Sequence, residues 1–264
     1  MTAPLVRLGV RVRADRAEEA LARLLPVLSA GAEERAMGEV VEYALYGVAG
    51  ELPSVERVRE LAGDVFVDAV QEPVPADWDR RWHEFLEPVR IGDLVIRPPW
   101  VDGAASDVVI EPGPSFGAGG HLTTRLCLRL LLDARPAGGL CDWGAGSGVL
   151  AIVAARLGWS PVTAVEVNRG ALATISGNAV VNGVAVRVEE GDVTRAPRWA
   201  PTVVANLTRP VLVAAARRVE RPPERLLASG FLAREADEVV AAWGMREARR
   251  LVDGEWAAVE VVAP

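Results

Sequence analysis

A glycine-rich turn lies between two apolar runs over residues 139–158, and it constrains the fold of this chain more than any other segment. Its glycines occupy the alternate positions Gly144, Gly146 and Gly148. Glycine lets a backbone turn tightly and lets a ligand approach without a Cβ in the way, and a helix that begins there presents free N–H groups. The segment therefore predicts a buried strand, a ligand-binding turn and a helix.

Short apolar strands and longer helices alternate from Val89 onward. This alternation is typical of a parallel, doubly wound α/β sheet, which we expect over residues 91–264. The strands are expected at Asp93–Ile96, Val108–Ile110, Gly139–Trp143, Val162–Val167, Val184–Glu189, Thr202–Asn206, Arg225–Ser229, 245–251 and 256–262. The helices are expected at about 122–134, 148–158, 169–182, 208–219 and 231–243.

Residues 1–72 follow another order: strand, helix, two strands, helix, strand. Leu5–Arg13 alternates apolar and polar residues as a half-buried strand does, and Asp15 and Ser54 can each cap a helix. This βαββαβ order is that of a ferredoxin-like domain. The segment has no glycine-rich loop, so we expect it to recognise a substrate. Further strands are expected at Glu39–Tyr46 and Val65–Val70.

Residues 73–90 are expected to link the two domains. Several prolines stiffen this stretch. Trp78 and Trp82 are four residues apart and would share one helical face. They form either an apolar clamp between domains or a surface on which a ligand stacks.

Two details of the glycine-rich turn discriminate between ligands. Its spacing is G-x-G-x-G, whereas the turn that binds a dinucleotide pyrophosphate reads G-x-G-x-x-G. Asp142 stands two residues before the first glycine, and a carboxylate there repels a diphosphate but pairs with the ammonium of an amino-acid ligand. S-adenosylmethionine (SAM) has such an ammonium and no phosphate, so the turn favours SAM.

Acidic residues follow the next two strands. Glu166 lies 22 residues after Gly144, where a carboxylate at a strand end accepts hydrogen bonds from two ribose hydroxyls. Asp192 either bonds the adenine amino group or only shapes a turn.

Together these residues resemble the motif series of class I SAM-dependent methyltransferases. The stretch EPGPSFGAGGHLTT at residues 111–124 is more specific. It is similar to the D-P-G-x-x-F-G-T-G-x-H-x-T-T segment of the PrmA family, the methyltransferases of large-ribosomal-subunit protein eleven. The likeness covers about residues 75–264. It implies a Rossmann-like, seven-stranded SAM domain, a ferredoxin-like recognition domain before it, and methyl transfer to lysine or N-terminal amines of a basic ribosomal protein.

The resemblance also implies roles for single residues. Phe116 would belong to a loop that closes over the cofactor. Ala118 and Arg209 depart from the family pattern, so they bear on which substrate is used. The positions that contact SAM in the family correspond to Thr124, Gly144, Glu166 and Asn206.

Asn206 is the candidate catalytic residue, because it ends an apolar strand at the edge where parallel sheets bind ligands. Its amide oxygen can orient an amine N–H toward the methyl group, and an amide is not a base, so we predict that it positions and does not deprotonate. The alternative is that it caps the helix at 208–219. His121 is either a base or a structural donor. Thr123 and Thr124 cap the next helix or bind SAM.

Charge and composition limit the partners. The 264 residues carry a net charge of −7, and all 29 basic residues are arginine. Such a chain suits a basic partner better than nucleic acid. With two cysteines and two histidines, neither a disulfide framework nor a metal site is expected. Apolar runs fall short of the ~18–20 residues of a membrane span, and the N-terminus does not read as a signal peptide. We therefore expect a cytoplasmic monomer.

Other functions remain open from the residues alone. The same SAM enzyme could act on a different protein or a small molecule. A NAD-binding oxidoreductase would need a phosphate-compatible turn and a Tyr–Lys pair, and the chain has no lysine. A SAM-binding module without catalysis is the third alternative.

Overall fold

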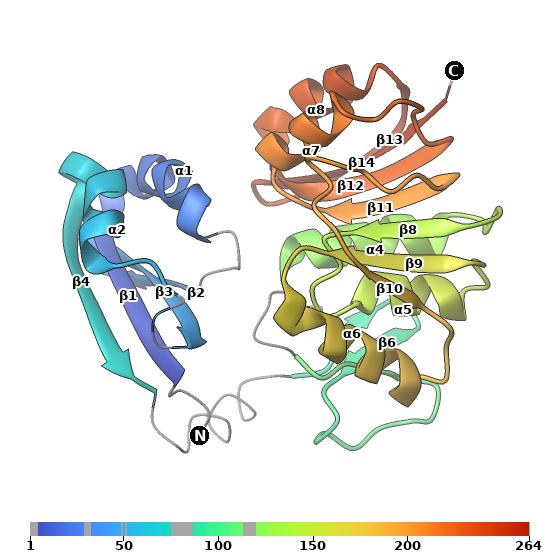
Figure 1. Ribbon diagram of the computed structural model, residues 1–264, viewed down its shortest axis with the longest axis horizontal. Helices are drawn as coiled ribbons and strands as arrows, with labels where there is room; N and C mark the ends of the chain where they lie inside the picture. Colours follow the sequence, from blue (N-terminus) through green and yellow to red (C-terminus); the bar gives the residue numbers. More distant parts are fainter. Residues whose placement is uncertain are drawn as a thin grey trace. The chain divides into compact units, whose positions relative to one another are not determined.

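The computed structural model describes residues 5–28, 33–48, 50, 52–74, 87–112 and 120–263. The chain divides into two compact units, Met1–Phe85 and Leu86–Pro264. Figure 1 draws the first in blue and cyan and the second in green to red. The predicted linker at 73–90, with Trp78 and Trp82, lies mostly outside the described residues.

The first unit is a four-stranded antiparallel sheet with the strand order β2-β3-β1-β4. One core joins both helices to the sheet, because the buried side chains of all three pack in a single cluster. The predicted ferredoxin-like order is confirmed. The strands are β1 (Leu5–Arg13), β2 (Glu33–Met37), β3 (Val40–Val48) and β4 (Phe66–Pro73), and the helices are α1 (Ala17–Leu28) and α2 (Val55–Ala62).

Local signals explain this unit well. Leu8, Val10 and Val12 alternate along β1 and are fully buried against the helices. Ser54 caps α2 as predicted, since its hydroxyl accepts a hydrogen bond from the Arg57 N–H at 3.2 Å. Asp15 does not cap α1; its carboxylate pairs with Arg13 instead.

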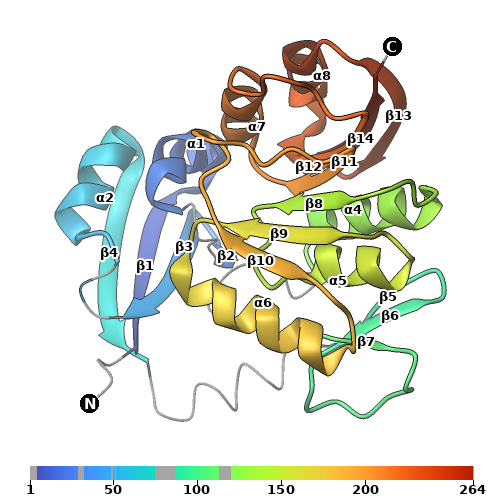
Figure 2. The ribbon, with the colours of Figure 1, turned by 45° about the vertical axis from the view of Figure 1, so that its right-hand side comes forward.

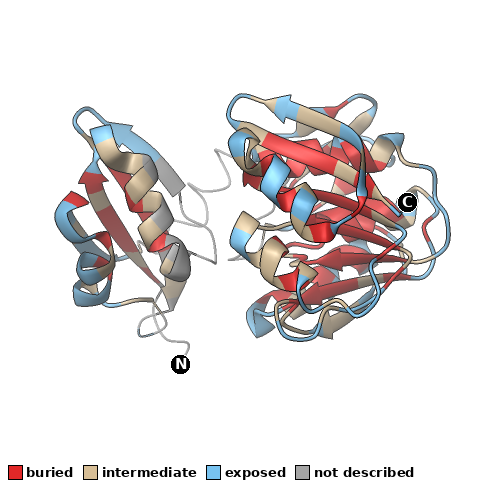
Figure 3. Cartoon of the chain, turned by 90° about the horizontal axis from the view of Figure 1, so that it is seen from above, coloured by how far each residue is buried: buried red, intermediate tan, exposed pale blue. Residues whose placement is uncertain are grey.

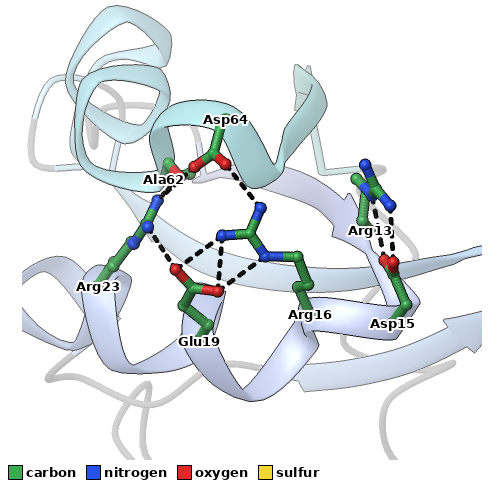
Figure 4. A network of polar contacts seen from close by, with 7 residues as sticks. All are labelled: Arg13, Asp15, Arg16, Glu19, Arg23, Ala62 and Asp64. Atoms are coloured by element: carbon green, nitrogen blue, oxygen red, sulfur yellow. Dashed lines mark hydrogen bonds and ion pairs between the residues drawn. The ribbon is translucent and has the colours of Figure 1, made fainter.

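A network of charged side chains joins α1 to the 3₁₀ turn after α2 (Figure 4). Arg16 donates to Asp64 at 2.6 Å and to Glu19 at 2.8 Å. Arg23 donates to Glu19, to Asp64 at 2.9 Å and to the Ala62 carbonyl at 2.9 Å. Two arginines and two acids thus alternate around one ring, and this lowers the pKa of Asp64 to about 2, mainly through the hydrogen bond from Arg16.

Replacing Asp64 with asparagine should loosen this junction. A carboxylate whose pKa falls from 3.8 to about 2 on folding adds stability above about pH 4, and this stability is lost as the pH falls toward 2. Hydrogen exchange over α1 and α2 should therefore be faster in Asp64→Asn at pH 7, with the difference from wild type vanishing near pH 2. Glu60→Gln is the control, because Glu60 pairs only with exposed Arg57 among the described residues. Equal exchange in wild type and Asp64→Asn at pH 7 would contradict the argument.

The second unit is built on a seven-stranded sheet with the order β10-β9-β8-β11-β12-β14-β13. Six of its seven strands run in the same direction, and β14 runs antiparallel to its neighbours β12 and β13. The predicted seven-stranded, doubly wound α/β sheet is confirmed, but it is mixed and not purely parallel because β14 is reversed. After α8 the chain forms the outermost strand first and returns through a tight hairpin at Gly254 (φ +57°), so its last strand inserts in the opposite direction. The strands are β8 (Leu140–Trp143), β9 (Val162–Glu166), β10 (Arg187–Glu190), β11 (Thr202–Asn206), β12 (Arg225–Leu232), β13 (Arg246–Asp253) and β14 (Trp256–Val262).

Helices cover both faces of this sheet. One buried cluster joins the strands to α4, α5 and α6, and a second joins them to α7 and α8. The strands are largely buried, and the helices present exposed outer faces (Figure 3). The sheet is thus the buried middle layer and offers ligands only its edges. The helices are α4 (Leu122–Asp133), α5 (Val149–Arg156), α6 (Arg169–Val181), α7 (Arg209–Ala216) and α8 (Ala236–Trp243).

Three short strands form a separate sheet, β5-β6-β7. The predictions at Asp93–Ile96 and Val108–Ile110 are strands, but placing them in the doubly wound sheet was wrong. Strands of two to four residues are too short for their sequence to indicate which sheet they join. Their bounds are β5 (Val89–Ile91), β6 (Leu94–Arg97) and β7 (Val108–Val109). None of the described helices is long and apolar enough to cross a membrane.

Candidate active site

The carboxyl ends of β9, β8 and β11 lie side by side at the point where the strand order reverses. Trp143, the last residue of β8, pairs with Val165 on one side and Ala205 on the other. The next residue along the chain is therefore Gly144 after β8, Glu166 in β9 and Asn206 in β11. Neighbouring strands are about 4.8 Å apart, so the predicted ribose ligand and the predicted catalytic amide flank the turn at a topological switch point, where doubly wound sheets bind ligands.

The glycine-rich turn needs its glycines. Gly144, Gly146 and Gly148 have φ values of +71°, +57° and +82°, which side chains disfavour. A Cβ on Gly144 would clash with the Leu207 Cδ2 atom. Gly148 is the N-cap of α5 in the left-handed conformation. The turn is therefore packed closely against the chain that follows β11.

Leu207 is also held from the other side. Its N–H donates to the Ser229 carbonyl at 2.9 Å. The ladder between β12 and β14 shifts there, at Gly230, whose φ is +96°. A Cβ on Gly230 would lie 2.5 Å from the Leu207 carbonyl oxygen. Leu207 thus lies between Gly144 and Gly230, and its main chain fixes where Asn206 ends β11.

Glu166 connects the turn to its neighbours. One carboxylate oxygen accepts from the Gly146 N–H at 2.9 Å, and the other accepts from the Asn168 N–H at 2.9 Å. The residue is 8% exposed. An ionised carboxylate has about four acceptor sites, so these two bonds leave capacity for ribose hydroxyls, and that role stays a prediction.

Asp142 lies beneath the turn and is fully buried. Its Oδ2 accepts from the Ala151 N–H in α5 at 3.0 Å. Its Oδ1 is buried and has no hydrogen-bond partner among the described residues. Burial raises the pKa of Asp142 from 3.8 to about 7. A cation beside Oδ1 would satisfy this oxygen and favour the ionised form.

Asn206 contacts the start of α4. Its Nδ2 donates to the Thr124 hydroxyl at 3.0 Å. Its Oδ1 is buried, and nothing in the described part of the chain donates to it. The alternative of a helix cap is wrong, because α7 begins at Arg209 and its N-cap is Thr208. The amide therefore offers an acceptor beside the turn that the fold itself does not use.

His121, and not Thr123 or Thr124, caps α4. Its Nδ1 accepts from the Thr123 N–H at 3.3 Å and lies 2.7 Å from the Thr123 hydroxyl. The ring meets Trp256 edge to face, with centroids 5.2 Å apart, and burial lowers the pKa of His121. His121 has a structural role, but as an acceptor and not as the predicted donor, and the threonine cap is wrong because an imidazole acceptor occupies that position.

Asp192 shapes a turn. Its Oδ1 accepts from the Thr194 N–H at 2.9 Å and from the Thr194 hydroxyl at 2.6 Å, which together lower its pKa. A contact with adenine stays a prediction. Phe116 and Ala118 lie outside the described residues.

The sequence analysis missed two buried asparagines, one in the last part of α6 and one at its C-cap. Asn178 and Asn182 are 2% and 7% exposed. The signal was available: both amides stand at helical spacing on the face that carries Ile175 and Ala171. A buried amide needs hydrogen-bond partners, so such a pair indicates a backbone segment packed on the helix.

Comparison with known proteins decides which family uses this site. Residues 32–263 match the family described as "Ribosomal protein L11 methyltransferase (PrmA)". The chain belongs to this family. It is therefore a SAM-dependent methyltransferase, as predicted, and the NAD-binding oxidoreductase is excluded.

Relatives in the family span most of the chain. It is 42% identical over 216 residues to the ribosomal protein L11 methyltransferase of Pelotomaculum thermopropionicum, covering 76% of this chain and 70% of that one. It is 36% identical over 253 residues to the enzyme of the same name from Thermus thermophilus, covering 90% and 93%.

A solved structure has a similar fold. It is a ribosomal protein L11 methylase from Lactobacillus delbrueckii subsp. bulgaricus, with a TM-score of 0.58 and 21% identity. The match covers 66% of this chain and 95% of that one.

The residues of the PrmA-family site fit SAM. The buried Asp142 Oδ1 suits the ammonium of its methionine part, and Glu166 suits its ribose. Neither assignment breaks a bond of the fold: Asp142 keeps its bond from Ala151 through Oδ2, and each Glu166 oxygen has acceptor capacity left beside its bond from Gly146 or Asn168.

Proposed function

We propose that this chain transfers methyl groups from SAM to amines of ribosomal protein L11, on lysine side chains or the N-terminus. The proposal depends on one observation above the others: Asn206 presents a buried Oδ1 at the end of β11, and none of the described residues donates to it. Its Nδ2 is already bonded to Thr124, so the amide cannot rotate freely. An acceptor held in this way suits the N–H of an incoming amine.

SAM, held by the turn and its two acids, would supply a methyl group carried on a positively charged sulfur. A substrate amine would attack that methyl carbon, the C–S electron pair would go to sulfur to leave a neutral thioether, and the nitrogen would release one proton to solvent. A lysine amine with a pKa of ~10.4 must lose its proton before it attacks. Burial of that amine beside the end of β11 would lower its pKa. Asn206 then accepts one N–H and orients the lone pair, which is positioning and not acid–base catalysis.

The turn and its two acids would hold the methyl donor. We assign Asp142 to the ammonium, Glu166 to the ribose hydroxyls, and Gly144 and Gly146 to close approach of the ligand. Thr124 fixes Asn206 and stands at a family position that contacts SAM. We keep Asp192 and Phe116 as further cofactor contacts.

The charge of the first unit supports a basic protein as substrate. Residues 1–72 carry eight arginines and thirteen acidic residues. The relatives are named for ribosomal protein L11, and a basic ribosomal protein complements an acidic surface. We further propose that the enzyme acts as a monomer in the cytoplasm and does not bind nucleic acid, since its net charge is −7.

Arg209 departs from the family pattern, so its contacts bear on whether the enzyme uses another substrate. Its Nε lies 3.2 Å from the Glu235 carboxylate and its Nη1 lies 2.7 Å from the Glu238 carboxylate, both in the α8 region. Its guanidinium is therefore engaged with α8, which favours the family's substrate over a new one.

The test is mass spectrometry of L11 after incubation with the purified chain and isotopically labelled SAM. We expect mass increases in methyl steps on L11 and none on a second basic ribosomal protein of similar size. The enzyme has no lysine, so any methyl-lysine comes from the substrate. An unchanged L11 beside a labelled protein in a ribosomal extract would reject L11 and favour the alternative.

A further inference from the structure

The side chains of Asn178 and Asn182 hydrogen-bond to the main chain of one extended segment, residues 109–111. The Asn182 amide accepts from the Val109 N–H at 2.9 Å and donates to the Val109 carbonyl at 2.6 Å. The Asn178 amide does the same for Glu111, at 2.8 Å and 3.0 Å. Each side-chain amide thus replaces the partner residue that a neighbouring strand would supply.

The geometry explains why this works. Four residues of α-helix rise about 6 Å, and two residues of β-strand rise about 6.6 Å. Amides four apart on α6 therefore match alternate residues of an extended chain. The opposite edge of β7 faces β6, where the Ile110 N–H donates to the Arg97 carbonyl at 2.9 Å. Figure 2 shows the small sheet beside the C-terminal half of α6.

Only one of the two amides also reaches the glycine-rich turn. The Asn178 Nδ2 donates to the Ser147 carbonyl at 2.9 Å. Ser147 lies between Gly146 and Gly148 and is fully buried. The other Asn182 bond stays within α6, where its Nδ2 donates to the Asn178 carbonyl at 2.8 Å. Asn178 therefore joins the turn to the extended segment at Glu111.

We propose that Asn178 is a positioning residue for SAM: it sets the glycine-rich turn in register with residues 108–112, whereas Asn182 serves only the fold. A displaced Ser147 carbonyl would carry Gly146 with it, and the Gly146 N–H is bonded to Glu166. Loss of Asn178 would thus disturb both the turn and the predicted ribose ligand. The inference rests on SAM binding at this turn and not on the identity of the methylated protein.

The test compares Asn178→Ala with Asn182→Ala. Both remove a buried amide that pairs with both backbone groups of one residue, so both should lower the unfolding midpoint. We expect the dissociation constant for SAM, measured by calorimetry without protein substrate, to rise about tenfold in Asn178→Ala and to stay within twofold in Asn182→Ala. In turnover, Asn178→Ala should raise the KM for SAM while kcat at saturating SAM stays within about threefold.

A second variant, Asn178→Asp, tests the same contact if Asn178→Ala does not fold. Asn178→Asp keeps an acceptor for the Glu111 N–H but loses the donor to the Ser147 and Glu111 carbonyls, so it should weaken SAM binding by a similar factor. Equal dissociation constants in the Asn178 and Asn182 variants would overturn the proposal and leave both amides structural. A wild-type chain that binds SAM but leaves L11 unmodified would reject the proposed substrate and not this inference.

Discussion

Replacing Asn206 with alanine should lower kcat about a hundredfold or more while leaving the dissociation constant for SAM within about threefold. The alanine removes the buried acceptor that orients the amine, and loss of alignment at the reacting atoms costs about this much. The Thr124 hydroxyl loses its donor but is small and can turn to another partner. Methyl transfer to L11 under saturating SAM, beside calorimetry with SAM, gives both quantities.

The matched control is Thr124→Val, which has nearly the same shape. It removes the oxygen that receives the Asn206 Nδ2, so Asn206 stays but is held less firmly. We expect a fall in kcat of about tenfold, smaller than that of Asn206→Ala. Wild-type turnover by a folded Asn206→Ala would remove Asn206 from the mechanism.

Replacing Asp142 with asparagine should weaken SAM binding about tenfold to a hundredfold, the range expected for one hydrogen bond to a charged group. Asparagine can still accept from the Ala151 N–H, so the start of α5 keeps its contact. What is lost is the negative charge at the orphaned Oδ1. Asp93→Asn is the control, because it removes an exposed carboxylate from the turn between β5 and β6.

The pH dependence gives an independent check on Asp142. Its pKa without ligand is about 7, and only the ionised form attracts an ammonium. The wild-type dissociation constant for SAM should therefore rise by up to tenfold per pH unit below pH 7, and that of Asp142→Asn should not. An affinity that is constant between pH 6 and 8 in the wild type would refute the ion pair.

The affinity for SAM should rise with pH, but the free energy of unfolding of the ligand-free protein should fall. The folded state holds the Asp142 proton up to about pH 7, whereas the unfolded chain releases it near 3.8. Between these values the folded state binds more protons, so burial of Asp142 makes the ligand-free protein less stable as the pH rises. Asp142→Asn should therefore unfold at a higher temperature than wild type at pH 7.5 without SAM.

Sequence patterns predict those features of the fold that depend on residues close together in the chain. The bounds of β11, Thr202–Asn206, agree with the prediction residue for residue, because an apolar run ends there in a polar amide. The glycine-rich turn and the Ser54 cap of α2 were predicted from the sequence in the same way. The antiparallel place of β14 was not, because strand order depends on contacts between distant segments.

The site shows the same division. Sequence spacing brought Glu166, Gly144 and Asn206 to one edge, since each ends an apolar strand or follows one. It did not show that Asp142 lies beneath the turn, because burial depends on how α5 packs. It also missed Asn178, whose partners lie 31 and 67 residues away in the chain.

Leu207 acts as a spacer between the glycine-rich turn and the bend in β12. Its side chain rests against Gly144 of the turn, and its main chain rests against Gly230 of β12. The distance between the turn and β12 is thus fixed by one leucine that lies between two residues without side chains. Substitutions elsewhere in the site would leave that distance intact, so a scaffold of this kind can acquire new protein targets and still hold SAM in the same way.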